Sequence, residues 1–344
     1  MLLQAIAPLK KIQTRRRILL LTAKATTKQL GRNRRGRPVH GILLLDKPSG
    51  GSSNHALQRA KRVFDAKKAG HTGSLDPLAT GMLPICFGEA TKLSAFLLHA
   101  DKGYETTMQL GLTTDSADAD GEVLQTRLVP EDLSEEKFKS ICKKFKGHLQ
   151  QIPPMVSAIK IDGKRLYKLA REGIVVDRPA RSIIIHELEV LSFSGTTARL
   201  SVKCSKGTYI RSLVTDIGEA IGCGAHVAEL RRTFVSPFEQ RTMIEMGSLE
   251  LMSEEPKSSL DELLLPLDAG LAHLCAVQIS EEGIATFRRG QSPECLVLQP
   301  PQFETVSGTE SLCRVYDKDS VLLGLGELSE TGEHVAPRRV LQMD

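Results

Sequence analysis

The residues of this sequence best suited to chemistry lie in one short segment, residues 70–81, which reads GHTGSLDPLATG. Its glycines and its proline fix an unusual backbone path, and His71 and Asp76 stand within it. Spacing alone favours a tight connection in which Asp76 only caps a turn. Such a rigid loop is costly to specify, however, and functional residues tend to lie on loops that a scaffold holds. We therefore keep residues 70–81 as the candidate site.

The common metal and cofactor motifs do not occur in the sequence. Residues 116–121 resemble a calcium loop, but Ser116 stands at the first ligand position and Arg127 at the twelfth, where glutamate is required. Phosphate-loop, dinucleotide, HExxH and GxSxG patterns all fail. The 7 cysteines are odd in number and form no CxxC pair, so we expect neither a zinc site nor a disulfide framework, and a reducing compartment fits best. The expected chemistry uses no metal and no cofactor.

The elements that must position the candidate segment can be read from periodicity. A short buried strand is predicted at residues 41–45 (GILLL), and Ser52 or Ser53 can cap the helix that follows. Residues 70–81 are predicted as a loop. Further strands are predicted at residues 83–87, 104–110, around 123, 157–161, 183–191, 198–204 and 227–235. Helices are predicted at residues 91–99, 134–145, 166–171, 209–221 and 259–265. Strands outnumber helices without strict alternation, which predicts an α+β fold with a central mixed or antiparallel sheet and flanking helices.

The chain of 344 residues is longer than one ordinary domain requires. We expect a basic, disordered extension at residues 1–38, a main domain at 39–270 and a small β-barrel-like domain at 271–344. From about Cys275 the pattern changes to short strands, ending in a pair at residues 313–316 and 321–325, which suggests an all-β module. No apolar run approaches the roughly 20 residues of a membrane-spanning helix.

Basic residues are concentrated at the start of the chain. The net charge is +5, yet no acidic residue precedes Asp46. A mild basic bias fits a polyanionic partner, although many unrelated enzymes share it. The basic segment is interpreted as a solvated arm, and the alternative is a mitochondrial transit peptide. We therefore expect a cytoplasmic protein, with a mitochondrial location as the alternative.

A long ordered series of sequence blocks surrounds the candidate segment. GILLLDKPSG precedes it and LPICFGEATKLSAFLL follows it; DKGY, TTDSADADGEV, QIPPMVSAIKIDGKRLYKLAREG, CSKGTYIRSL and GCGAHVAELRR come later. Together these blocks resemble the TruB family of tRNA pseudouridine synthases from about residue 40 to residue 235. The segments FRRGQSP, VLLGLGEL and VAPRRVL resemble, more loosely, the PUA-type RNA-binding domain of bacterial members. Gly51 and the long basic arm depart from the family pattern.

The resemblance implies that the T-loop uridine of tRNA is isomerised to pseudouridine. Asp76 matches the family's catalytic aspartate, and covalent catalysis by a carboxylate is physically reasonable. Whether it attacks the sugar or the base, or acts as a base, stays open. Arg211 matches the active-site arginine, which would orient the carboxylate and favour its ionised form. Its alternative is an ordinary surface charge on a helix.

Three further residues match positions that contact the flipped uracil base or the opened RNA loop. By resemblance, Tyr104 stacks on the flipped base and assists proton removal, and Leu230 lines the uracil pocket. From pattern alone, Tyr104 is better explained as a core residue of a strand, and simple core packing is also the alternative for Leu230. His71 matches a histidine that packs against the opened RNA loop, because an aromatic face can replace stacking that base extrusion removes. The alternative is a histidine that only bonds the loop backbone.

Candidate phosphate contacts come from basic residues near these blocks. They are Lys47, Lys206, Arg231, Arg232, Arg338 and Arg339. Each alone is more often a solvated surface charge. The acidic stretch at residues 115–120 would repel phosphate, so we expect it on the rim of the site or away from the RNA backbone. The expected partner is the T stem-loop of tRNA, with no membrane and no obligatory protein partner, and the expected state is a monomer.

Two other functions remain open at this stage. A chaperone that opens tRNA loops without chemistry would need only the basic arm and the β-rich C-terminal part. The matches at Asp76, Tyr104 and Arg211 argue against it, because a pure binder gains nothing from a buried charged pair. A glycosylase with the same base-flipping step would release free uracil.

Overall fold

The computed structural model describes residues 36–157, 159–161, 163–300 and 311–343. Most of the predicted basic extension therefore lies outside the described residues. Among the residues that are described, no helix has the length and apolar character needed to cross a membrane.

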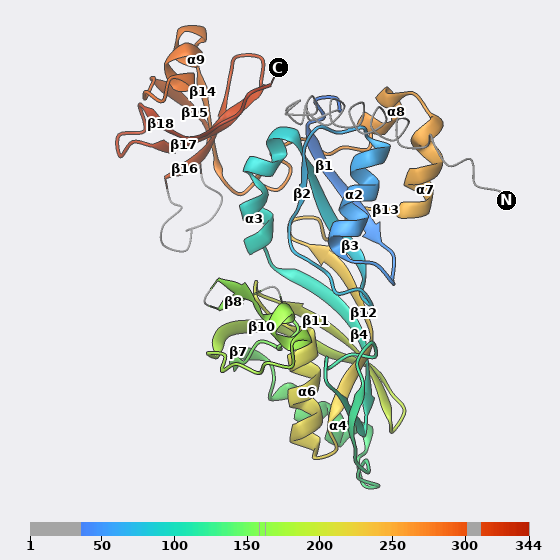
Figure 1. Ribbon diagram of the computed structural model, residues 1–344. Helices are drawn as coiled ribbons and strands as arrows, with labels where there is room; N and C mark the ends of the chain where they lie inside the picture. The colour runs from blue at the N-terminus through green and yellow to red at the C-terminus, as the bar shows by residue number, and fades with distance from the viewer. Residues whose placement is uncertain (1–35, 158, 162, 301–310, 344) are drawn as a thin grey trace, which may run out of the picture. The chain divides into compact units, whose positions relative to one another are not determined.

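The main feature is a nine-stranded mixed sheet (Figure 1). Its order is β13 (Ile244–Glu245), β1 (Gly41–Lys47), β3 (Thr80–Phe87), β12 (Ala225–Val235), β4 (Lys102–Leu110), β11 (Thr197–Cys204), β10 (Arg181–Phe193) and β7 (Gly147–Gln151), with β2 (Ala69–His71) paired to β3. The β1–β13 and β12–β3 pairs are parallel, whereas the other pairs are antiparallel. This arrangement confirms the predicted α+β fold with a central mixed sheet.

Helices and short hairpins flank this sheet (Figure 1). The helices are α2 (Ser53–Val63), η1 (Gly88–Lys92), α3 (Ser94–His99), α4 (Glu135–Lys143), α5 (Leu166–Arg171), α6 (Ile210–Ile221), α7 (Met246–Leu251), η2 (Met252–Glu254) and α8 (Lys257–Asp261). The hairpins are β5 (Leu112–Thr114) with β6 (Val123–Thr126), and β8 (Lys160–Ile161) with β9 (Lys164–Arg165). In α2, Ala56, Leu57, Ala60 and Val63 recur at helical spacing and are buried, so one face of the helix joins the core.

The C-terminal part contains a separate five-stranded sheet in the order β15 (Cys295–Gln299), β14 (Cys275–Ile279), β16 (Leu312–Tyr316), β17 (Leu322–Leu328) and β18 (Val335–Val340). A core of its own, centred on Val277, Phe287 and Val315, fills one side of this sheet. Phe287 comes from a helix, α9 (Glu281–Arg288), which the all-β prediction missed. The helix begins at Ser280, whose side chain accepts a hydrogen bond from the Gly283 amide.

Several local predictions need correction. The ends of residues 70–81 belong to β2 and β3, so the true loop is shorter than expected. The helix predicted at residues 91–99 is divided between η1 and α3. Of the strand predicted at 157–161, only Lys160–Ile161 is extended among the described residues. The helix predicted at 259–265 begins and ends earlier, as α8.

Candidate active site

Side chains of β1 and α2 hold the loop between β2 and β3 through hydrogen bonds to its backbone. Ser53 is 3 % exposed, and its hydroxyl both accepts from the Leu75 amide (2.7 Å) and donates to the Leu75 carbonyl (3.0 Å). The Lys47 ammonium donates to the carbonyls of Pro77 (3.2 Å) and Ala79 (2.7 Å). These bonds satisfy backbone groups that the irregular loop leaves outside any ladder. They fix the segment immediately before and after Asp76.

Arg232 of β12 holds the other parts of the same segment. Its Nε donates to the Met82 carbonyl (2.6 Å) and its Nη2 to the Gly73 carbonyl (3.1 Å). The backbone of Arg232 also pairs with Gly81 in the parallel β12–β3 ladder. Gly81 has φ +98°, and a Cβ there would lie 2.2 Å from the Arg232 carbonyl oxygen. Only glycine fits this close approach.

Asp76 and Arg211 form a bidentate ion pair within this frame. Arg211 Nε lies 3.0 Å from Asp76 Oδ2, and Nη2 donates to Oδ1 at 3.2 Å. Arg211 Nη1 and Nη2 also donate to the carbonyls of Ser116 and Val156, each at 2.7 Å. The Arg211 side chain is 3 % exposed, whereas that of Asp76 is 37 % exposed. The arginine is thus fixed inside the protein, and its partner carboxylate is half-buried, with part of its surface left exposed.

The protonation of Asp76 reflects competing influences. Burial raises the pKa of this carboxyl above its ordinary value, and the nearby Asp118 carboxylate acts in the same direction. The charge and hydrogen bonds of Arg211 lower the pKa, as the sequence suggested, but they do not outweigh burial. Arg211 therefore orients the carboxylate and limits the rise in its pKa.

Asp118 is a buried member of the site that sequence reasoning missed. The acidic stretch was expected on the rim, but Asp118 is 4 % exposed and its Oδ2 lies 3.5 Å from Arg211 Nη1. Its loop docks on β12, where Val227 accepts from the Ala119 amide and donates to the Ala117 carbonyl. Arg211 is therefore held between two carboxylates. No sequence signal distinguishes Asp118 from its acidic neighbours.

Tyr104 and Leu230 lie on the adjacent strands β4 and β12. Each is 8 % exposed and belongs to the main core. In the antiparallel register, Tyr104 pairs with Arg232 and Leu230 with Thr106. Burial raises the pKa of the Tyr104 phenol, and the Arg232 guanidinium opposes that rise. The Tyr104 phenol is therefore neutral near neutral pH.

His71 lies at the end of β2 and is partly exposed. Burial lowers the pKa of its ring, and the positive charge of Arg232 lowers it further. Its Nδ1 has no hydrogen-bond partner among the described residues. The ring is therefore neutral near neutral pH.

The predicted phosphate contacts fall into two groups. Lys47 is 0 % exposed and Arg232 is 1 % exposed, and both ammonium and guanidinium bond to loop carbonyls. In this structure both cations therefore hold the backbone of the loop, and neither is exposed on the outer surface. Arg231 pairs with Asp46 at 2.6 Å but keeps 43 % of its side chain exposed. Lys206 and Arg339 are exposed, and Arg338 pairs with Glu327.

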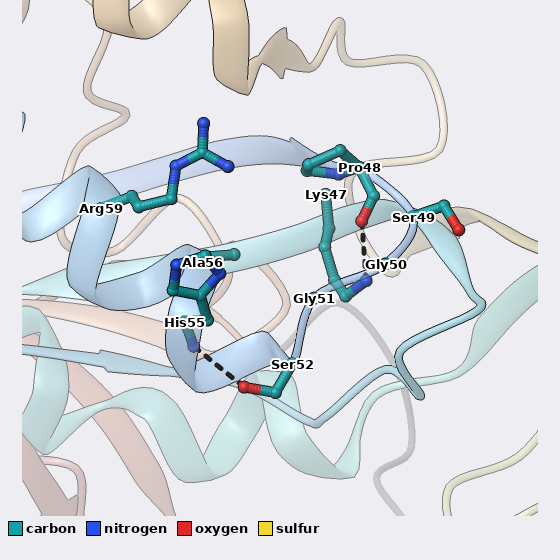
Figure 2. A pocket seen from close by; sticks show the side chains of 9 residues that line it. All are labelled: Lys47, Pro48, Ser49, Gly50, Gly51, Ser52, His55, Ala56 and Arg59. Atoms are coloured by element: carbon teal, nitrogen blue, oxygen red, sulfur yellow. Dashed lines mark hydrogen bonds between the residues drawn. The ribbon is translucent and has the colours of Figure 1, made fainter.

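A cavity of about 150 Å³ lies beside the start of α2 (Figure 2). It is lined by Lys47, Pro48, Ser49, Gly50, Gly51, Ser52, His55, Ala56 and Arg59. Of the predicted site residues, only Lys47 lines it. The described residues contain no group of three or more histidine, cysteine, aspartate or glutamate side chains placed to hold a metal ion.

Comparison with known proteins gives consistent matches. The model described as "TruB family pseudouridylate synthase (N terminal domain)" matches residues 61–210. The tRNA pseudouridylate synthase B C-terminal domain model matches residues 211–272, and the "Pseudouridine synthase II TruB, C-terminal" model matches residues 275–341. The tRNA pseudouridine synthase B of Pseudomonas putida is 51 % identical over 309 residues, covering 90 % of this chain and 97 % of that protein. That of Stutzerimonas stutzeri is 50 % identical over 312 residues, covering 90 % and 97 %.

Solved structures give the same fold. An archaeal box H/ACA Nop10–Cbf5 complex contains a chain with a TM-score of 0.65 and 24 % identity, covering 91 % of this chain and 93 % of that chain. A Cbf5–Nop10–Gar1 complex contains one with a TM-score of 0.64 and 26 % identity, covering 92 % and 91 %. At this identity, the first comparison supports the fold alone.

Proposed function

This chain belongs to the TruB family of pseudouridine synthases, and we propose that it isomerises the T-loop uridine of tRNA to pseudouridine. The observation that supports this most directly is the partly exposed Asp76 carboxylate, which stands on a hydrogen-bonded loop and is held bidentately by the buried Arg211. The curated relatives that share about half of the residues over most of the chain are named tRNA pseudouridine synthase B.

The reaction needs a nucleophile but no redox step. The N-glycosidic bond to N1 of uracil breaks, the base turns, and a new bond joins C5 to the same sugar carbon. The C5 proton leaves and N1 gains a proton, so the atoms balance. Ionised Asp76 attacks the sugar or the base and is released after the base has re-bonded. Both routes require the carboxylate to be charged, and Arg211 favours that form.

The residues around Asp76 receive roles that fit their positions. Tyr104 and Leu230, two residues apart in the register of the neighbouring strands β4 and β12, form the wall against which the flipped uracil packs. The neutral Tyr104 phenol can exchange a proton with the base once RNA excludes water. His71 packs against the opened T loop, and its neutral ring suits stacking. Arg231 and Lys206 remain the exposed contacts for phosphate near this site.

The same proposal covers the domains and the cellular setting. Residues 39–270 form the catalytic domain, residues 271–344 form a PUA-like RNA-binding domain, and residues 1–38 are a basic extension. Because affinity for RNA depends on phosphate contacts, binding should weaken as salt rises. We place the enzyme in the cytoplasm, acting as a monomer on tRNA without an obligatory protein partner.

The test is tritium release from tRNA labelled at C5 of uridine, without added metal or cofactor. Wild type should release tritium, whereas Asp76→Asn should bind tRNA normally and release none, because an amide is not a nucleophile but keeps the shape of the side chain. Asp132→Asn, at an exposed ion pair with Lys137, is the matched control and should behave as wild type. Normal turnover by Asp76→Asn would refute the assignment of the nucleophile. Free uracil would indicate a glycosylase, and tight binding without release by wild type would indicate a chaperone.

A further inference from the structure

Arg232 is a buried cation that the proposed reaction has not yet used. At 1 % exposure it is the largest of the fully buried side chains in the described residues. A charge in such a place is costly unless it is hydrogen-bonded. Its bonds go to the carbonyls of Met82 and Gly73, both of which belong to the segment around Asp76.

The contacts of Arg232 lie on both sides of Asp76 in sequence. The side chain holds Gly73, three residues before Asp76, and the backbone pairs with Gly81, five residues after it. The pairing at Gly81 is so close that any side chain there would collide with the Arg232 carbonyl. One residue therefore fixes the entry and the exit of the catalytic loop.

The same residue lies opposite Tyr104. The β12–β4 register places Arg232 and Tyr104 as direct partners on neighbouring strands. Side chains that face each other across an antiparallel pair lie within contact distance. Tyr104 is buried, so a neighbouring charge acts on its phenol with little screening by water.

We propose that Arg232 is a positioning residue. Its side chain and backbone hold the Asp76 loop on both sides of Asp76, and its guanidinium charge lies next to the Tyr104 phenol. This inference rests on the proposed function, because that function assigns Asp76 and Tyr104 their roles on the same uridine. It replaces the interpretation of Arg232 as a phosphate contact.

The influence of the Arg232 charge on neighbouring pKa values supports its link to Tyr104. The Arg232 guanidinium counteracts the rise that burial imposes on the pKa of Tyr104, whereas the Cys204 thiol and the Asp76 carboxylate act with burial. Arg232 also lowers the pKa of His71. The charge of Arg232 thus acts on Tyr104 and His71 together.

The shape of the guanidinium explains why arginine stands here. Its nitrogens form a rigid planar fork, so Nε and Nη2 reach two separate carbonyls while the charge stays beside Tyr104. A lysine would keep the charge but offer one compact ammonium in place of the fork. Arg232→Lys therefore separates the geometric contribution from the charge.

The first measurement uses the wild-type protein. The chain contains 4 tyrosines and no tryptophan, so labelled tyrosine rings give few resonances, and Tyr104→Phe identifies that of Tyr104. With labelled arginine side chains, a nuclear Overhauser effect should connect the Tyr104 ring to the Arg232 guanidinium. Absence of this effect in folded wild type would overturn the proposal, and the measurement needs no RNA.

The second measurement compares variants. Arg232→Lys should lower kcat by about 10²-fold, the size of loss expected from a small displacement of catalytic groups, with a smaller change in KM. Arg232→Gln should in addition shift the Tyr104 resonance, because the charge is gone. Arg199→Lys is the control: Arg199 lies on β11, on the other side of β4, is exposed and pairs with Glu105, and its variant should match wild type in both readouts.

The outcomes separate the two proposals. Folded Arg232→Gln with an unchanged Tyr104 resonance and wild-type kcat would overturn the role of Arg232. If neither variant folds, the wild-type nuclear Overhauser effect decides. If wild type releases no tritium, the proposed function fails, while the effect between Arg232 and Tyr104 still reports whether the two side chains are coupled.

Discussion

Alanine variants of the two adjacent serines at the start of α2 should separate an effect on stability from an effect on kcat. Ser52 caps the helix by accepting a hydrogen bond from the His55 amide at 3.1 Å. Ser53, one residue later, is turned inward and holds Leu75 of the catalytic loop through two hydrogen bonds. We expect Ser53→Ala to lower kcat and Ser52→Ala to leave it unchanged.

The magnitudes follow from the groups that each change leaves unpaired. Ser53→Ala deprives the Leu75 amide of its partner inside the protein, and Leu75 is 6 % exposed. Leaving such a buried donor unsatisfied costs about 1–3 kcal/mol. If the loop shifts in the resting variant and must return to its wild-type position in the transition state, about 1.4–2.7 kcal/mol of that cost appears in the activation barrier, which corresponds to a loss of roughly 10- to 100-fold in kcat. Ser52→Ala removes a helix cap and costs about 1 kcal/mol of stability.

The assay combines denaturant unfolding with the tritium-release kinetics. Both variants should lose comparable stability, so a difference in kcat cannot come from the unfolded fraction. Tyr104 and Arg211 are untouched in both, which restricts the effect to the position of the loop. A Ser53→Ala enzyme with wild-type kcat and reduced stability would refute the view that Ser53 positions Asp76.

The Asp76–Arg211–Asp118 cluster gives two further predictions. Because burial raises the pKa of Asp76, its ionised fraction falls as pH decreases through that raised value. The value of kcat/KM should therefore decline on the acid side at a higher pH than for an ordinary aspartate, whose pKa is about 3.9. A pH–rate profile that stays flat down to about 3.9 would contradict this expectation. Arg211→Met removes the group that lowers the pKa of Asp76, so the acid limb of the pH–rate profile should move to higher pH. The change also leaves the Asp76 and Asp118 carboxylates without their shared counter-ion, so the free energy of unfolding should fall by roughly 3 kcal/mol. Denaturant melts measure this loss. Asp118→Asn is the matched comparison, since it removes a carboxylate that raises the pKa, and an acid limb that moved in the same direction as in Arg211→Met would show that Asp76 is not the titrating group.

Strand β1 could be predicted from sequence because its burial is nearly uniform, and β4 because its burial alternates. Residues 41–45 are apolar throughout and become β1, which is buried along almost its whole length. The helix at residues 166–171 was predicted with the bounds it has in the structure. The helix α9 was missed because it is short and its one large buried side chain, Phe287, gives no periodic signal.

The candidate site could be predicted only in part. Residues 70–81 were found from their composition, and the roles of Asp76, Tyr104 and Arg211 came from resemblance. The choice between Ser52 and Ser53 as the cap stayed open, because both have the right side chain and only the backbone path decides. The burial of Asp118 could not be predicted, since it depends on a loop docking on β12, far away in sequence.

The burial of Lys47 and Arg232, which were predicted as exposed phosphate contacts, has one physical cause. A sequence gives the charge of a side chain, but it does not show whether that charge is solvated at the surface or hydrogen-bonded to backbone carbonyls. An irregular loop inside a protein must satisfy its carbonyls without a ladder, and a cation with several donors can bond more than one carbonyl at once. Lys47 bonds the carbonyls of Pro77 and Ala79, and Arg232 those of Gly73 and Met82. Basic residues next to a glycine-rich catalytic loop are therefore candidates for holding that loop as well as for binding phosphate, and exposed fraction distinguishes the two.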